Sequence, residues 1–328
     1  IKSNLKTFIQ AKSEFSDYDF EASGLSNILD VLAYNTHLNG LTANFAINES
    51  FLNSSQLRSS VVAHAETLGY YPASKTGSSA TIGFNVVTTD TVTASASIPA
   101  FTTFTGTLGD STFTFQTLEA HTAVNDGTGT FEFKTSTGLS AVQITEGTQK
   151  TKTFLVGDTD ENQVYVIPDA DLDKDTLKVE VFDTTTSSTF NAYNDIETVV
   201  RIDTTSKVYI IRETPNGQFE ILFGDGSVLG QAPTAGNKIV VTYLATNGAD
   251  ANSINTFTAN STVAIGGTSY SPTVTTTVSS AGGDAKESIA SIKSNAPITF
   301  ASQQRLVTAE DYKAIIKQRL LNIKNDCT

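Results

Sequence analysis

The spacing of apolar residues changes twice along this 328-residue chain, and that change constrains the fold more than any other feature. From Ala22, apolar side chains recur at three- and four-residue intervals, the period of a helix that buries one face. From about residue 78 to 281 they alternate with polar residues, as in strands with one face on a core. After Asp284 the helical period returns. The pattern predicts an α+β chain whose N- and C-terminal helical segments flank a large, mainly antiparallel β region.

The N-terminal helical region, residues 1–75, carries two expected helices. The second is expected to open at Asn53, with Gln56 three residues later as in a capping box, and to stop at Gly69. The first has an apolar stripe at Leu25, Ile28, Leu29 and Leu32 that continues to Leu38, Leu41 and Phe45. Short helices cannot bury such a stripe alone, and periodicity leaves open whether this chain's core or a partner helix covers it.

The β-rich body is expected to span residues 76–283, with a variable inserted β subdomain at about 105–205. The segments that predict strands most clearly are 82–86, 177–181, 208–211, 219–223, 238–244 and 273–278. Turns between strands are expected at Asp126-Gly127, Asn216-Gly217, Asp225-Gly226 and Asn247-Gly248. Phe223-Gly224-Asp225-Gly226 is interpreted as a tight turn and not as a phosphate loop, because no lysine and no helix is expected after it.

The C-terminal helical region, residues 284–328, carries two further expected helices. The first is capped by Asp284 with Glu287 and should stop before Pro297, and the second is capped by Thr308 with Asp311. The sequence starts at Ile1, contains no methionine and has no stop signal after its last apolar segment. We therefore expect it to be part of a longer chain.

Charge and cysteine content exclude several classes of partner. The formal net charge of -13 opposes binding to nucleic acid or to an anionic membrane, both of which require clustered Lys and Arg. The one cysteine, Cys327, is compatible with folding in a reducing cytoplasm. No apolar run approaches the roughly 20 residues that span a bilayer. We expect neither a nucleic acid nor a membrane as partner.

Motifs for catalysis or metal binding are weak. The histidines, His37, His64 and His121, have no partner at ligand spacing, and no G-x-S-x-G elbow or P-loop occurs. The sequence therefore predicts no catalytic residue and no cofactor site. Many sites leave no linear trace, so a carboxylate pair that cleaves glycans stays open as an alternative.

One acidic run partly matches a calcium-binding loop. Asp169, Asp171, Asp173 and Asp175 alternate, and Glu180 stands at the twelfth position. The sixth position, however, is Lys174 where such loops need glycine, and Glu180 lies in an alternating strand pattern. The run is interpreted as an acidic turn before a strand, and no metal is predicted.

Five segments of the N-terminal region form a collinear series: 13–21 (SEFSDYDFE), 30–36 (DVLAYNT), 48–52 (NESFL), 57–62 (LRSSVV) and 69–75 (GYYPASK). Together they resemble baseplate wedge proteins of T-even-type contractile phage tails. Segments 223–226 (FGDG), 240–243 (VVTY), 247–252 (NGADAN) and 303–312 (QQRLVTAEDY) are similar to the broader baseplate J-like pattern. All of them follow the family's order. One departure is Phe101, where the family's strand turn often has glycine.

The resemblance implies a scaffold in the virion tail baseplate, assembled in the cytoplasm of the host bacterium. In this family, two copies of the wedge subunit wind their helices around an elongated wedge partner protein. Wedges then form a ring around the central hub, and the sheath initiator and neighbouring baseplate proteins dock on it. The ring changes shape when the sheath contracts.

On this basis a set of residues is expected at helix interfaces or domain junctions, and the two arginines in it could pair with carboxylates. The set is Tyr18, Phe20, Leu25, Ile28, Leu29, Leu32, Tyr34, Leu57, Arg58, Val61, Arg305 and Tyr312. Structural turns are expected at Gly224, Asp225, Gly226, Asn247 and Gly248. The alternative function is a phage adhesin, which would display aromatic residues at the loop tips of its β body.

Overall fold

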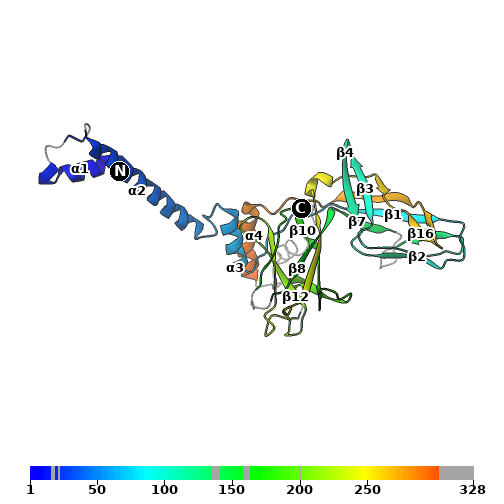
Figure 1. Ribbon diagram of the computed structural model, residues 1–328. Coiled ribbons are helices and arrows are strands. Elements are labelled where there is room, and N and C mark those ends of the chain that lie inside the picture. Colours follow the sequence, from blue (N-terminus) through cyan, green and yellow to red (C-terminus); the bar gives the residue numbers. More distant parts are fainter. Residues whose placement is uncertain (16–18, 21–22, 135–140, 158–162, 200, 303–328) are drawn as a thin grey trace.

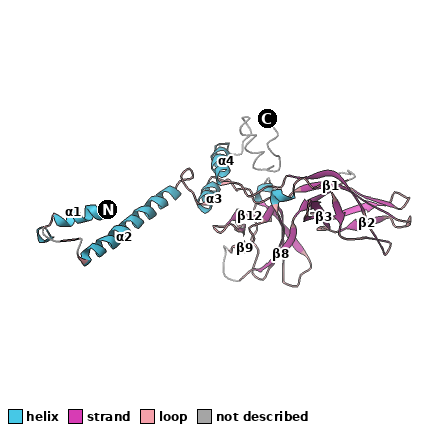
Figure 2. Ribbon diagram, turned by 90° about the horizontal axis from the view of Figure 1, so that it is seen from above, coloured by secondary structure: helices cyan, strands magenta, loops and turns pink. Residues whose placement is uncertain are grey.

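A computed structural model describes residues 1–15, 19–20, 23–134, 141–157, 163–199 and 201–302. Its parts follow one another along an elongated molecule: a helical arm, a pair of short helices, an inner β lobe and an outer β lobe (Figure 1). Seen from above, the arm again projects away from both lobes (Figure 2). The predicted α+β class, with helices flanking a mainly antiparallel β region, is confirmed.

The helical arm is a hairpin of two helices. Helix α1 spans Lys2–Gln10 and is followed by a short 3-10 turn, η1, at Ser13–Phe15. Helix α2 spans Gly24–Glu49, 26 residues, and continues without interruption through the predicted stripe. Of the helices in the described part of the chain, none is both long enough and apolar enough to cross a membrane.

The short helices are α3, Arg58–Thr67, and α4, Ile289–Ser302, and they pack against each other. The predicted start of α3 at Asn53 was wrong, because the free N–H groups before Arg58 are bonded by Glu49 at the end of α2 and need no local cap. The predicted stop at Gly69 is confirmed. Gly69 has φ +77°, and Tyr70 N–H donates to the carbonyl oxygen of Ala65 at 2.9 Å, which closes a Schellman motif.

Two predictions for α4 were wrong. The helix does not stop before Pro297 but continues through it. Its packing against α3, with Ile292 and Ala296 fully buried beside Val61, outweighs the hydrogen bond that proline removes. The hydroxyl of Ser288, and not Asp284, accepts the N–H of Ser291 at the start of the helix.

The outer lobe is built on a seven-stranded antiparallel sheet with two small ribbons. Along β1 the alternating residues Ile82, Phe84 and Val86 all face the core, as their period predicts. The ring of Phe84 lies edge-on to that of Phe104, with centroids 5.5 Å apart. The sheet comprises β1 Ser79–Val87, β3 Thr103–Leu108, β4 Ser111–Gln116, β6 Thr130–Phe133, β7 Val142–Glu146, β15 Phe257–Ala259 and β18 Thr273–Ala281. The ribbons are β2 Ser95–Ile98 with β5 His121–Val124, and β16 Val263–Ile265 with β17 Thr268–Tyr270.

The inner lobe is a second seven-stranded sheet with its own core, which includes Val179, Val181, Ile239 and Val241. All its strand pairs are antiparallel except β11 with β12. The strands are β8 Thr148–Leu155, β9 Tyr165–Ile167, β10 Leu172–Phe182, β11 Phe190–Asp195, β12 Val208–Glu213, β13 Phe219–Phe223 and β14 Lys238–Ala245. Short 3-10 turns, η2 Ile196–Thr198 and η3 Gly248–Ala251, follow β11 and β14.

The expected insertion at 105–205 does not coincide with a lobe. Residues 148–245 supply all strands of the inner lobe, whereas the outer-lobe sheet takes its strands from both sides of that segment. The 105–205 segment therefore straddles the two lobes. The Thr- and Gly-rich composition of residues 105–160 reflects turns and solvent-exposed strand faces, which both lobes contain, and does not mark a domain boundary.

The two lobes meet at the crossings, the segments where the chain passes from one lobe to the other. Two buried carboxylates form hydrogen bonds that join these segments. Glu146, at the end of β7, accepts hydrogen bonds from Thr246 Oγ1 at 2.6 Å and from Asn247 Nδ2 at 2.8 Å. Asp173, in β10, accepts the N–H of Gly77 at 2.8 Å. A Cβ at Gly77 would lie 2.4 Å from the carbonyl oxygen of Glu146, so only glycine fits this crossing.

Phe101, in the turn between β2 and β3, has φ +61°, a left-handed conformation that favours glycine. Its ring is held by the ammonium group of Lys178 on β10, 5.1 Å from the ring centroid. The same ammonium group donates a hydrogen bond to the carbonyl oxygen of Leu118 in the outer lobe. The contact therefore joins the lobes and offsets part of the backbone strain.

We expect Phe101→Gly to be more stable than Phe101→Ala by about 1 kcal/mol. Both variants lose the ring contact with Lys178, but only alanine keeps the strained backbone. Denaturant unfolding of the two variants measures the difference directly. Equal stabilities would show that the backbone relaxes once the ring is removed.

Candidate assembly interface

Helix α2 exposes an apolar stripe with alternating three- and four-residue spacing. The stripe consists of Val31, Tyr34, Leu38, Leu41 and Phe45, and each side chain is between 40% and 67% exposed. This spacing places the five residues at the a and d positions of successive heptads, the arrangement that packs helices into coiled coils. We call these five residues the α2 seam.

The arm itself covers only the beginning of α2. Leu29 is 1% exposed, and α1 packs along this half of the helix, where Lys2 and Asp30 form an ion pair at 2.7 Å. Leu25 is half-buried, but Ile28 and Leu32 are exposed. Leu29 is therefore part of a core within this chain, as one of the two alternatives predicted. The five seam residues, by contrast, are exposed and available to a partner.

The joint between α2 and α3 is held by Glu49. Its carboxylate accepts the N–H groups of Gln56 at 2.7 Å and of Leu57 at 3.3 Å. Its backbone carbonyl lies 2.9 Å from Nε2 of His64 on α3. The Gln56 N–H is the main reason that the pKa of Glu49 lies below its ordinary value. These bonds fix the direction in which the arm leaves the body.

Arg58 connects α3 to the inner lobe and to the segment before α4. Its Nε and Nη2 atoms donate to the two carboxylate oxygens of Glu213 on β12, both at 2.8 Å. A third donor, Nη1, bonds the backbone carbonyl of Glu287. Glu213 is only 7% exposed and also lies 3.7 Å from the ammonium group of Lys286. This bidentate pair fixes α3 on the sheet.

Glu287 organises the interior between α3 and α4. Its carboxylate accepts hydrogen bonds from the hydroxyl of Tyr70 at 2.7 Å, from Ser291 Oγ at 2.6 Å and from Asn295 Nδ2 at 3.0 Å. Burial, followed by the charge of Glu287, raises the pKa of Tyr70 above its ordinary value. A buried network with several donors resists local opening, so the arm is attached to a rigid base.

We expect Arg58→Ala to destabilise the chain by about 3 kcal/mol, because it leaves Glu213 nearly buried without its main partner. Arg58→Lys should recover part of the loss, since lysine cannot form the bidentate pair. Unfolding in denaturant measures both effects. The matched control is Arg212→Ala on β12, next to Glu213, because its pair with Glu220 is more exposed and should contribute less than about 1 kcal/mol. Equal losses for the two alanine variants would contradict the role of Arg58.

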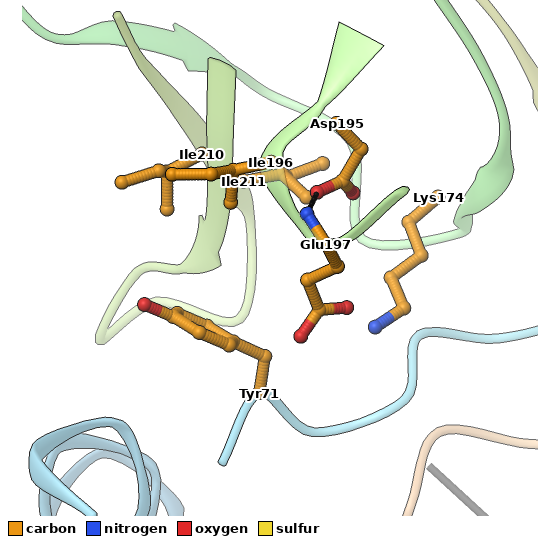
Figure 3. Close-up of a pocket in the computed structure, with 7 residues that line it drawn as sticks. All are labelled: Tyr71, Lys174, Asp195, Ile196, Glu197, Ile210 and Ile211. Atoms are coloured by element: carbon orange, nitrogen blue, oxygen red, sulfur yellow. Dashed lines mark hydrogen bonds between the residues drawn. The ribbon is translucent and has the colours of Figure 1, made fainter. Parts of the chain in front are cut away.

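A small pocket lies beside this junction. Figure 3 shows that Tyr71, Lys174 and Ile210 line it together with η2 and the end of β11. Burial raises the pKa of Asp195, whose carboxylate accepts the N–H of Glu197 at 3.0 Å and so caps η2. The cavity measures about 10 Å³, far below the roughly 300 Å³ at which ligand pockets begin. Its geometry favours a structural role for Asp195.

The acidic run at the start of β10 is satisfied by protein groups. Asp169 pairs with Lys150 at 2.7 Å, Asp171 pairs with Lys75 at 3.0 Å, and Asp173 accepts the Gly77 N–H. Across the described residues, no group of three or more His, Cys, Asp or Glu side chains gathers as metal ligands would. The run works as a set of structural contacts at the junction of the lobes.

Two models of known protein families match stretches of this chain. "Baseplate wedge protein gp6-like, helical domain" matches residues 1–70, which contain the arm and α3. "Bacteriophage baseplate wedge protein gp6, third domain" matches residues 152–245, nearly the whole inner lobe. The chain belongs to the gp6-like family of baseplate wedge proteins.

The chain is also similar to the baseplate wedge protein gp6 of Enterobacteria phage T4, with 30% identity over 356 residues. That similarity covers 98% of this chain and 50% of the T4 protein, so the chain spans about half the length of its curated relative. Among solved structures, the chain is similar to a chain of the anti-feeding prophage baseplate, and the matched region covers 95% of this chain and 56% of that one. The two sequences are 14% identical and the TM-score is 0.28.

The expected interface residues fall into three groups within the gp6-like architecture. Tyr34 is exposed on the seam, and Leu57 is 48% exposed at the start of α3. Phe20 and Val61 are buried within the chain, Val61 in the core that α3 shares with α4. Tyr18, Arg305 and Tyr312 lie outside the described residues.

The dipeptides that predicted turns all lie in turns, but two of them do not close a β-hairpin. Asp225-Gly226 lies in the connection from β13 to β14, strands that are not neighbours in the sheet. Asn247-Gly248 opens η3 at the junction between the lobes, and Gly248 has φ +71°. These dipeptides fix a local backbone conformation and do not specify which strands pair. Asn216-Gly217, by contrast, closes the β12–β13 hairpin as predicted.

Sequence reasoning missed several residues that shape the exposed arm and its attachment to the lobes. Val31 belongs to the seam, and a strict count of three and four from Tyr34 and Leu38 would have found it. Glu49 and Glu213 carry no such signal. Glu213 lies 155 residues from Arg58, and a single sequence does not indicate that these two side chains meet.

Proposed function

We propose that this chain is a structural part of a baseplate wedge in a contractile phage tail. Its α2 seam winds together with the same helix of a second copy and with a helix of an elongated wedge partner protein. The observation that carries the proposal is the exposed heptad stripe on a 26-residue helix that projects from the body. Family membership supports the same role.

The width of the apolar face favours more than one partner helix. At 100° per residue, Ile28 and Leu32 lie roughly 60° and 100° around the helix from Val31, so they widen the seam on one side. Burying one large apolar side chain contributes about 1.5–3 kcal/mol, while association costs about 4–15 kcal/mol. A three-helix bundle covers such a face more completely than a single contact does.

The remaining roles proposed for the wedge require a rigid body at the base of the arm. The proposed wedge is non-catalytic. It joins neighbouring wedges into the ring, contacts the sheath initiator and other baseplate proteins, and takes part in the rearrangement during sheath contraction. Its place in the virion is the tail baseplate, and it assembles in the host cytoplasm. The Arg58 pair and the Glu287 network support this proposal because they couple the arm to the lobes.

The adhesin alternative predicts aromatic residues on the loop tips of the β body. The exposed aromatic side chains of the described residues lie mainly on and beside the arm, at Phe8, Tyr34, Phe45 and Phe51. This distribution favours helix-to-helix assembly over recognition of a receptor by the lobes.

Disrupting the gene in the phage distinguishes the wedge function from the adhesin function. A wedge component is required to build the baseplate, so the disrupted phage should yield lysates without complete tails in electron micrographs. An adhesin is not required for building. Complete, contractile tails that fail to adsorb to the host would contradict the wedge proposal.

A further inference from the structure

The connection between β13 and β14 contains a loop, residues 224–230, whose backbone is fixed from within. One carboxylate oxygen of Asp225 accepts the N–H groups of Ser227, Val228 and Leu229, at 2.9, 2.8 and 2.9 Å. The N–H of Gly226 donates to the carbonyl oxygen of Gly230 at 2.8 Å and closes the loop at its base. These three backbone donors hold the pKa of Asp225 well below its ordinary value, so the carboxylate stays ionised and keeps its bonds.

The base of the loop is packed backbone against backbone. A Cβ at Gly224 would lie 2.3 Å from the carbonyl oxygen of Leu229, so the two sides of the loop are in close contact. A neighbouring loop, residues 203–206, is tied to this base by the N–H of Gln231, which donates to the carbonyl oxygen of Ser206 at 2.8 Å. The loop therefore has a single defined shape on a firm support.

At its tip the loop exposes two consecutive large apolar side chains. Val228 is 69% exposed and Leu229 is 48% exposed. Single exposed apolar residues are common on protein surfaces, but flexible loops lose conformational entropy when they bind. A tip that its own hydrogen bonds already hold avoids much of that cost. The four hydrogen bonds hold the loop in one conformation, so Val228 and Leu229 form a preorganised contact surface.

The charge beside the tip indicates the kind of partner. Asp225 in the loop and Asp203 in the 203–206 loop tied to its base are both exposed, and Asp203 also uses its carboxylate to accept a local N–H, that of Thr205 at 2.9 Å. The chain carries a net charge of -13, so a second copy would bring further negative charge against these carboxylates. A complementary surface has an apolar recess for Val228 and Leu229 and a rim of Lys or Arg.

We infer that the 224–230 loop docks its apolar tip into a basic-rimmed recess on a neighbouring baseplate protein, separate from the helices that bind the α2 seam. This inference rests on the proposed wedge function. It assigns to the inner lobe a second assembly contact that the arm does not provide. The tip supplies the buried apolar area, and the two aspartates supply selectivity for a basic partner.

The test uses the full chain co-expressed with the neighbouring tail proteins of the same genome. A photo-reactive phenylalanine analogue replaces Val228, and in a control it replaces Val92, which is 90% exposed on the outer lobe. Irradiation of the purified complex should join position 228 to a protein other than this chain, and mass spectrometry should place the adduct beside Lys or Arg. The Val92 control should give little or no adduct.

Affinity measurements on substituted chains complete the experiment. Val228→Ser with Leu229→Ser should weaken binding of the cross-linked protein by about a hundredfold, tenfold for each side chain. Asp225→Asn keeps the acceptor oxygen but loses the charge, so it should weaken binding less than Asp225→Ala, which also frees the loop. Circular dichroism should show unchanged folding for every variant.

The outcomes separate the inference from the function on which it rests. If the wild-type complex forms but position 228 gives no more adduct than position 92, or joins only a second copy of this chain, the loop is not the proposed contact. The same conclusion follows if the double serine variant binds unchanged. If the wild-type chain forms no complex with the tail proteins, the wedge function fails and the loop inference fails with it.

Discussion

Replacing Leu38 and Leu41 by aspartate abolishes co-assembly with the wedge partners and leaves both lobes folded. Both side chains are exposed on the seam, so charge at these positions costs the isolated chain little. In a helical bundle each aspartate would be buried without a partner, and two lost leucine contacts add to that penalty. The expected loss is at least about 4 kcal/mol, or roughly a thousandfold in affinity. Size-exclusion chromatography of the co-expressed proteins detects it.

The matched control places the same charge on the same helix outside the seam. Thr36→Asp with Gly40→Asp adds two negative charges at exposed positions roughly 140° and 180° around the helix from Val31, away from the seam and from Ile28 and Leu32. This control should assemble normally. Leu29 is a poorer test position, because α1 already covers it within the chain. Unfolding of the whole chain by the Leu38 and Leu41 substitutions would contradict the assignment of an open seam.

The stability of the chain should fall as pH rises from about 4 to about 7, and Asp173 should cause much of this fall. Burial raises its pKa to about 7, and the nearby charges of Asp175 and Glu146 act in the same direction. Between its unfolded pKa of 3.8 and pH 7, the folded chain holds a proton that the unfolded chain releases. Deprotonation is therefore penalised only in the folded state, and the full penalty is on the order of 4 kcal/mol.

Asp173→Asn isolates this contribution. The neutral amide cannot titrate, so the variant should lose most of the decline between pH 4 and pH 7. It should also lose some stability at every pH, because its NH₂ group cannot accept the hydrogen bond that Gly77 or Asp175 donates. Urea unfolding across this pH range gives both quantities. Parallel curves for the variant and the wild type would show that Asp173 does not carry the pH dependence.

Local periodicity predicted much of the fold because each signal is read from neighbouring residues. Ile82, Phe84 and Val86 alternate, and the strand places all three in the outer core. Gly69 ends α3 because glycine alone adopts its backbone conformation without strain. The stripe through Leu38 and Leu41 predicted the long helix, whereas periodicity left open whether its apolar face is buried in this chain or exposed.

Features that depend on distant residues could not be predicted in this way. The start of α3 depends on Glu49, which supplies from α2 the acceptor that Asn53 was expected to provide. The division into lobes depends on strand pairing, and Asp225-Gly226 fixes a turn without fixing a pair. Asp173 is interpreted from the sequence as part of an exposed acidic turn, yet it is 2% exposed. Its burial arises only when both lobes and the Gly77 crossing are in place.

The mass of the complex formed with co-expressed neighbouring tail proteins tests the central claim most directly. The proposed wedge predicts a stable heteromer that contains two copies of this chain and one elongated partner. Substitution of the seam at Leu38 and Leu41 should reduce it to separate components. A monomer, or a self-trimer that ignores the tail proteins, would contradict the wedge function and favour an adhesin.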